Sequence, residues 1–187
     1  MFLGTSLTAG LGVEPEQAYP ALIQRKADSA GIEVIIENRG NSGETSAGAL
    51  ARLSWILQTP PAMIVIETGA NDGLRGQDPE TTKANIRAII SQIRARDSTT
   101  RIALVQMEAM PNLGRRYTER FHAIYPEIAR EDRVLLVPFL LDGVAGVDSL
   151  NQADGIHPTP RGHQIVAGTV WRALRPALAE LAQRGVR

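Results

Sequence analysis

Short apolar runs alternate regularly along this chain with longer segments of helical periodicity, and this alternation limits the folds that the chain can adopt. The apolar runs are rich in β-branched residues and too short for buried helices, which indicates strands. Continuous apolar runs of this kind are typical of parallel sheets covered on both faces. We therefore predict strands at residues 1–3, 33–37, 63–68, 102–107 and 134–138.

Helical segments separate these runs, and several have recognisable ends. Asp78-Pro79 and Thr159-Pro160 each read as an N-cap followed by a first-turn proline, while Gly31 caps segment 18–30. Further helices are predicted at 46–57 and at 117–130, the latter interrupted or restarted near Pro126. The apolar positions with helical spacing are Ile86, Ile89, Ile90 and Ile93 after the first cap, and Ile165, Val166, Val170, Leu174 and Leu178 after the second.

Strands that alternate with helices of this length predict right-handed βαβ units in a doubly wound parallel sheet. The 187 residues suit one domain, and a 20.2 kDa chain buries roughly 70% of its unfolded surface on folding. No internal repeat, low-complexity stretch or linker divides the chain. We predict a single α/β domain that spans residues 1–187.

Composition removes several functional classes. The absence of cysteine excludes disulfide frameworks, thiolate metal sites and cysteine nucleophiles. The 20 basic and 20 acidic residues give a net charge of zero. The chain as a whole therefore has no net electrostatic attraction for nucleic acid or an anionic membrane. No apolar run reaches the roughly 18 residues that a transmembrane helix needs, so no integral membrane segment is expected.

The sequence begins abruptly, because Met1, Phe2 and Leu3 resemble the end of a longer strand. That start is consistent with the loss of a preceding segment, and no signal peptide is visible. The sequence does not determine the localisation, and a cytoplasmic protein is expected only if the sequence is taken as given. A periplasmic or secreted protein is predicted if an N-terminal signal has been removed.

Polar and glycine-rich segments follow the predicted strands. Ligands of open α/β sheets bind beyond the carboxyl ends of the strands, so these segments are expected to meet at one crevice. The residues of chemical interest that stand there are Ser6, Gly43, Asn71, Asp154 and His157.

These residue types fit acyl transfer. A serine hydroxyl becomes a nucleophile when a base takes its proton, and an imidazole serves as that base when a carboxylate fixes its tautomer. Asp154 and His157 are three residues apart around Gly155, a spacing that a tight turn can close. Backbone N–H groups of Ser6 and Gly43 and the Asn71 side-chain amide supply donors for a tetrahedral oxyanion.

Each residue also has a plain structural interpretation. Ser6 is then a turn residue or an N-cap, Gly43 supplies a positive φ, Asn71-Asp72-Gly73 is an ordinary turn, and the Asp154–His157 pair belongs to a loop. The presence of all of them at strand ends favours chemistry.

The other histidines and the remaining motifs give weaker signals. His122 and His163 are rival bases, but both fall inside predicted helices and lack a carboxylate at turn spacing. Histidine pairs with metal-ligand spacing, phosphate-binding glycine loops and the G-x-S-x-G nucleophile elbow are absent, so no metal is expected.

The combination of Ser6 in Gly4-x-Ser6-Leu7 with Gly43, Asn71 in Gly-x-Asn-Asp, and Asp154-x-x-His157 resembles the SGNH (GDSL) hydrolase superfamily. The similarity is to the bacterial thioesterase I / lysophospholipase / arylesterase group, and it extends over residues 2–10, 41–53, 67–76, 114–125 and 154–158.

This resemblance implies a three-layer α/β/α, flavodoxin-like fold with a five-stranded parallel sheet, and hydrolysis of esters and thioesters without a cofactor. It implies catalytic roles for Ser6, His157 and Asp154, and an oxyanion hole formed by Ser6, Gly43 and Asn71.

The resemblance also suggests which loops contact substrate. Loop 74–78, with Leu74 and Arg75, is expected to close over acyl chains, and loop 108–113, with Met110 and Pro111, to form the opposite wall. Ile156 completes the expected substrate-binding set.

One position departs from the family pattern, because Thr5 stands where the family usually has aspartate. Threonine carries one hydroxyl and no charge. We therefore expect weaker support of the neighbouring loops with the nucleophile retained, and neutral drift at this position is weighed equally.

We expect a serine esterase for aryl and short-to-medium acyl esters, with thioesters as further substrates. The alternatives are a long-chain acyl-CoA thioesterase or lysophospholipase, and a carbohydrate acetylesterase. The last is disfavoured because aromatic residues make up only 4% of the chain and Trp55 and Trp171 are expected to face the core. A non-catalytic flavodoxin-like binding module is the remaining alternative, in which Ser6 and His157 lie apart. The sequence leaves the physiological substrate and the oligomeric state open.

Overall fold

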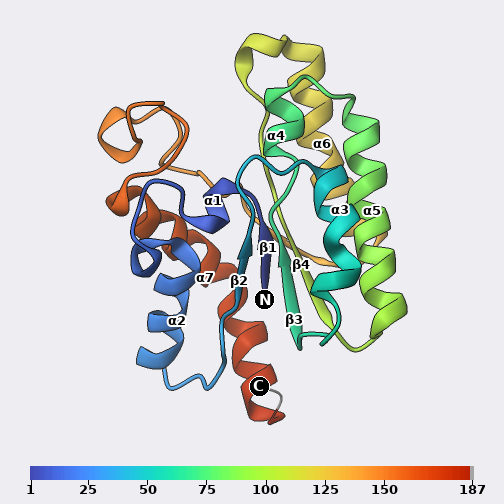
Figure 1. The fold of residues 1–187 in the computed structure, drawn as a ribbon, viewed down its shortest axis with the longest axis vertical. Coiled ribbons are helices and arrows are strands. Elements are labelled where there is room, and N and C mark those ends of the chain that lie inside the picture. The colour runs from blue at the N-terminus through green and yellow to red at the C-terminus, as the bar shows by residue number, and fades with distance from the viewer. Residues whose placement is uncertain (186–187) are drawn as a thin grey trace.

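The computed structural model describes residues 1–185 as a parallel sheet between two layers of helices (Figure 1). All strand pairs are parallel, in the order β2-β1-β3-β4-β5. The strands are β1 (Phe2–Gly4), β2 (Asn38–Gly40), β3 (Met63–Ile66), β4 (Arg101–Val105) and β5 (Leu135–Val137). This order is flavodoxin-like and places the topological switch point between β1 and β3, where the connections leave toward opposite faces.

Helices from both halves of the chain cover the sheet. Helices α2 (Tyr19–Ser29) and α7 (Pro160–Gln183) lie on one side, while α3 (Ser46–Ile56), α5 (Pro79–Arg96) and α6 (Arg115–Glu131) lie on the other (Figure 1). Two short helices, α1 (Ser6–Ala9) and α4 (Ala70–Leu74), follow β1 and β3 after one and three residues. Single 3-10 turns occur at Pro15–Gln17, Pro111–Leu113 and Asp148–Leu150. The three-layer α/β/α prediction is confirmed.

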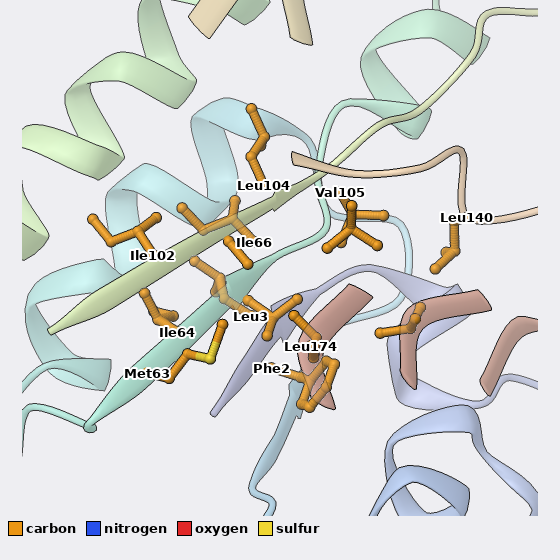
Figure 2. Packing of buried hydrophobic residues seen from close by; sticks show 14 of the residues in the cluster. Phe2, Leu3, Met63, Ile64, Ile66, Ile102, Leu104, Val105, Leu140 and Leu174 are labelled. Atoms are coloured by element: carbon orange, nitrogen blue, oxygen red, sulfur yellow. The ribbon is translucent and has the colours of Figure 1, made fainter. Parts of the chain in front are cut away.

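The core lies on both faces of the central strands (Figure 2). Every residue of β3 is buried, which confirms the prediction of a strand covered on both sides. The predicted stripe of Ile86, Ile89, Ile90 and Ile93 on α5 is also fully buried. Asp78 and Thr159 cap α5 and α7 through their side chains, as the sequence predicts.

One edge strand, β2, differs from the prediction. The second strand lies at Asn38–Gly40 instead of 33–37, and Ile35 within the predicted run is 72% exposed. At the end of this run, the Glu37 carbonyl accepts the Phe2 N–H of β1 at 2.7 Å. The side chain of Gln24 on α2 satisfies other backbone groups of the run, so no strand ladder forms there. An edge strand pairs with one neighbouring strand only. The position of an apolar run therefore does not show which of its residues form the pairing.

Two helix details also correct the prediction. Helix α6 continues through Pro126 without a break, because residues on either side of the proline, including Tyr125 and Ile128, are fully buried and hold both halves in place. Ile165 is 36% exposed, so it lies outside the buried apolar stripe that begins with Val166 on α7.

The two tryptophans differ in burial. Trp55 is 61% exposed, against the expectation that it faces the core, and its ring lies under the guanidinium of Arg39. Trp171 packs against the core from a partly buried position.

Candidate active site

The turn after β1 presents Ser6 at the carboxyl edge of the sheet. Thr5 is the N-cap of α1, and Ser6 is the first residue of the helix. The interpretation of Ser6 as an N-cap is therefore wrong, because Thr5 has that role. The N–H of a first helical residue has no partner within the helix and is free for an acceptor outside it. Ser6 is 8% exposed and lines a cavity.

The structure brings the predicted serine, histidine and aspartate together, although 151 residues separate Ser6 from His157. Ser6 Oγ lies 2.9 Å from His157 Nε2, and His157 Nδ1 lies 2.7 Å from Asp154 Oδ2. Gly155, with φ of 74°, makes the tight turn that puts the carboxylate beneath the ring.

Asp154 is held in its ionised form. Its Oδ1 accepts the backbone N–H groups of Ile156 and His157, each at 3.0 Å. The hydrogen bond from the His157 ring, followed by these backbone bonds, lowers the pKa of Asp154 to about 2. An ionised carboxylate at this place fixes the imidazole with Nδ1 protonated and Nε2 facing the serine hydroxyl.

The three expected oxyanion donors line the same cavity. Asn71 Nδ2 donates to the Glu44 carbonyl at 3.0 Å, which uses one of its two hydrogens and fixes the amide in place. Gly43 has φ of 79°, so its plain interpretation as a turn glycine also holds. Arg75 Nη2 donates to the Gly43 carbonyl at 3.0 Å and ties this loop to α4.

The cavity next to Ser6 has a volume of about 630 Å³ and a largely apolar wall. Four of the five expected substrate-binding residues lie in its lining: Leu74, Met110, Pro111 and Ile156. Arg75 is not among the lining residues and bonds Gly43 instead.

The sequence interpretation missed part of this wall. The missed residues lie in the connection after β5 and are Phe139, Leu141, Ala145, Gly146 and Asn151. One sequence feature could have indicated these residues. Residues 139–147 are mostly apolar, contain glycine, lack strand or helix periodicity and stand shortly before the Asp154 turn.

The two rival histidines have other partners. His163 is buried in α7, where its Nδ1 accepts the Tyr19 N–H at 3.3 Å, and burial lowers its pKa to about 4. His122 on α6 is exposed and lies 2.7 Å from Glu108 Oε1. His122 therefore has a carboxylate partner that its local sequence does not reveal, but no serine hydroxyl among the described residues bonds it.

Residues 1–185 contain no group of three or more histidine, aspartate or glutamate side chains arranged to hold a metal ion. Within the same residues, no helix combines the length and apolar character needed to cross a membrane.

A hydroxyl, an imidazole and a carboxylate bonded in series at the switch-point edge of a flavodoxin-like sheet, facing an apolar cavity, place this protein among the carboxylic ester hydrolases. The comparisons with known proteins agree. The chain belongs to the GDSL-like lipase/acylhydrolase family, whose model matches residues 2–165.

Similar proteins resemble the chain over nearly its whole length. Esterase TesA of Pseudomonas aeruginosa is 38% identical over 179 residues, which cover 95% of this chain and 88% of TesA. Thioesterase 1/protease 1/lysophospholipase L1 of Escherichia coli K12 is 37% identical over 177 residues, covering 94% and 83%. The crystal structure of the psychrotrophic esterase EstA from Pseudoalteromonas sp., inhibited by monoethylphosphonate, superposes with a TM-score of 0.89 at 31% identity, covering 95% and 96%. The predicted superfamily and fold are confirmed.

Proposed function

We propose that Ser6 is the nucleophile of this ester hydrolase, His157 its general base and acid, and Asp154 the group that orients His157. The observation that carries the proposal is the 2.9 Å contact between Ser6 Oγ and His157 Nε2, with Asp154 at 2.7 Å on the other ring nitrogen. The alternative hypothesis, a non-catalytic binding module, requires Ser6 and His157 to lie apart. The contact between their side chains argues against it.

The reaction proceeds in two steps. His157 Nε2 takes the Ser6 proton as Oγ attacks the ester carbonyl, and the imidazolium is stabilised by ionised Asp154. The imidazolium then protonates the departing alcohol, which leaves an acyl group on Ser6. Water, deprotonated by the same imidazole, attacks the acyl-enzyme, and Ser6 leaves with its proton restored.

Three donors act as the oxyanion hole. They are the N–H groups of Ser6 and Gly43 and the amide of Asn71, three residues that line the cavity. The Ser6 N–H is at the start of α1 and the Asn71 amide is held by the Glu44 carbonyl, so neither has to reorganise when charge develops on the carbonyl oxygen.

The cavity supports uncharged acyl or aryl groups of short to medium size as preferred substrates. Its wall is largely apolar, and burial of methylene groups there favours binding by about 0.8 kcal/mol each. Phe139 is the one phenyl or indole ring in this lining, which gives little platform for a sugar. A thioesterase or lysophospholipase activity on longer chains is the second candidate, supported by the name of the Escherichia coli relative.

A series of p-nitrophenyl esters from acetyl to palmitoyl, together with palmitoyl-CoA and a lysophosphatidylcholine, tests both candidates. We expect the highest kcat/KM for short to medium chains. Ser6→Ala should lower kcat by at least about 10³-fold with the fold retained. Absence of turnover on every substrate, or full turnover by Ser6→Ala, would overturn the proposal.

A further inference from the structure

A buried acid lies directly behind the proposed nucleophile and takes no part in the mechanism above. Glu67 follows β3 immediately and is 0% exposed. No cation among residues 1–185 pairs with it, although a buried carboxylate without compensation costs several kcal/mol. Burial raises the pKa of Glu67 to about 7, while hydrogen bonds from Thr5 and Thr8 act in the opposite direction.

The donors to Glu67 come from the two sides of Ser6. The Thr5 N–H donates to Glu67 Oε2 at 2.8 Å, and the Thr5 hydroxyl lies 3.0 Å from both carboxylate oxygens. The Thr8 hydroxyl donates to Oε2 at 2.8 Å. Glu67 therefore bonds the residue before Ser6 and a residue one half-turn after it, and the Ser6 backbone is held between them.

The close approach of Glu67 depends on Gly4. A Cβ at Gly4 would lie 2.0 Å from Thr8 Oγ and 2.8 Å from Glu67 Oε2, far inside contact distance. The glycine of the Gly4-x-Ser6 sequence is thus required because these two side chains pack against its backbone. No positive φ is involved at this position.

The direction of the hydrogen bonds follows from the chemistry of the groups. The Thr8 hydroxyl has one hydrogen, which it donates to Glu67, so Tyr19 must donate to Thr8 across their 2.6 Å contact. The Thr5 hydroxyl donates to Glu67 and accepts the Leu7 N–H as the cap of α1. An ionised Glu67 satisfies all of these hydroxyls at once.

We propose that Glu67 is a positioning residue for Ser6, which it holds by binding Thr5 and Thr8, and that Thr5 is suited to this role because its hydroxyl donates to the carboxylate. An aspartate at position 5 would place a second carboxylate about 3 Å from Glu67, and the two would have to share a proton. The inference rests on the proposed function of Ser6. Thr5 makes two donor bonds to this one buried acid, one from its backbone N–H and one from its hydroxyl.

Glu67→Gln tests the role with little change in shape. The amide places an NH₂ where Glu67 now accepts hydrogen bonds, so the turn must shift. We expect kcat on p-nitrophenyl butyrate to fall about tenfold to a hundredfold, as small misplacements of reacting groups do, while KM changes by less than about threefold because the cavity is intact. The rate at which diethyl p-nitrophenyl phosphate phosphorylates Ser6 should fall by the same factor as kcat.

Two variants of Thr5 test the same positioning role if Glu67→Gln folds poorly. Thr5→Ser retains the donating hydroxyl and should retain kcat within about threefold, whereas Thr5→Val removes the hydroxyl and should lower kcat about tenfold. In the double variant with Glu67→Gln, Thr5→Val should cost almost nothing further, because its partner is already lost.

A buried residue far from the turn provides the control for stability. Ile93→Ala in α5 should lower Tm and leave kcat and the phosphorylation rate unchanged. If Glu67→Gln and Thr5→Val lower Tm in the same way but leave both rates within about twofold of wild type, Glu67 has a structural role only and the inference is overturned. A wild-type protein that hydrolyses no ester would instead refute the proposed function.

Discussion

His163 should make the fold lose stability in acid, and His163→Asn should remove that loss. The side chain is 1% exposed, its ring stacks on that of Tyr19, and its Nδ1 accepts the Tyr19 N–H at the start of α2. A protonated ring would place an N–H against that donor and a charge within the layer between α2 and α7. Asparagine retains an acceptor oxygen near the same position and does not titrate.

The magnitude follows from the pKa of His163. Desolvation, and to a smaller extent the neighbouring His157, lowers this pKa from 6.5 to about 4. The unfolded chain therefore binds more protons than the fold between these values, and the free energy of unfolding decreases as the pH falls from 6.5 to about 4. At about 1.36 kcal/mol per pKa unit the decrease is at most about 3 kcal/mol, which corresponds to about 6–12 °C in Tm for a chain of this length.

A comparison of wild type with His163→Asn isolates the contribution of His163 to the pH dependence of stability. Glu67 has a raised pKa, so its contribution to stability changes in the opposite direction over an overlapping pH range. Wild type and His163→Asn share Glu67, and it cancels in their difference. Urea unfolding from neutral pH to about pH 4 should show the variant gaining about 3 kcal/mol relative to wild type. Parallel profiles of the two proteins would refute the reasoning.

Three further changes have distinct expected outcomes. Asn71→Ala removes one oxyanion donor and should lower kcat about 10²–10³-fold with little change in KM, measured on the preferred p-nitrophenyl ester. Gly69→Ala should cost at least about 2 kcal/mol in urea unfolding, because Gly69 has φ of 99° and its new Cβ would lie 2.2 Å from Tyr125 Oη. Trp55→Gln should change the free energy of unfolding by less than about 0.5 kcal/mol, since Trp55 is largely exposed and its ring contact is with Arg39 5.9 Å away.

Much of the fold and the proposed triad could be predicted from local patterns. The central strands and α5 carry apolar residues at the spacing of their element, and both faces of β3 are buried as that spacing requires. Asp154 and His157 are close in sequence, so a turn alone brings them together. Ser6 was placed by the rule that strand ends meet at one edge of a parallel sheet, together with the family resemblance.

The remaining features depend on neighbours that are distant in sequence. Position 35 is apolar but lies at an edge of the sheet, and nothing local marks it as exposed. Glu67 appears in sequence as the polar end of a strand, because its partners Thr5 and Thr8 are about 60 residues earlier. His122 and Glu108 are likewise brought into contact only by the packing of α6 beside β4.

Local patterns predict the alternation of strands and helices, their parallel arrangement and the set of chemically active residues at the strand ends, because periodicity, caps and turns are local properties. Long-range packing determines which segment pairs at the sheet edge, which residues line the cavity, and that a buried Glu67 bonds both sides of the Ser6 turn. These depend on distances between residues far apart in the chain, and such distances exist only once the layers have packed.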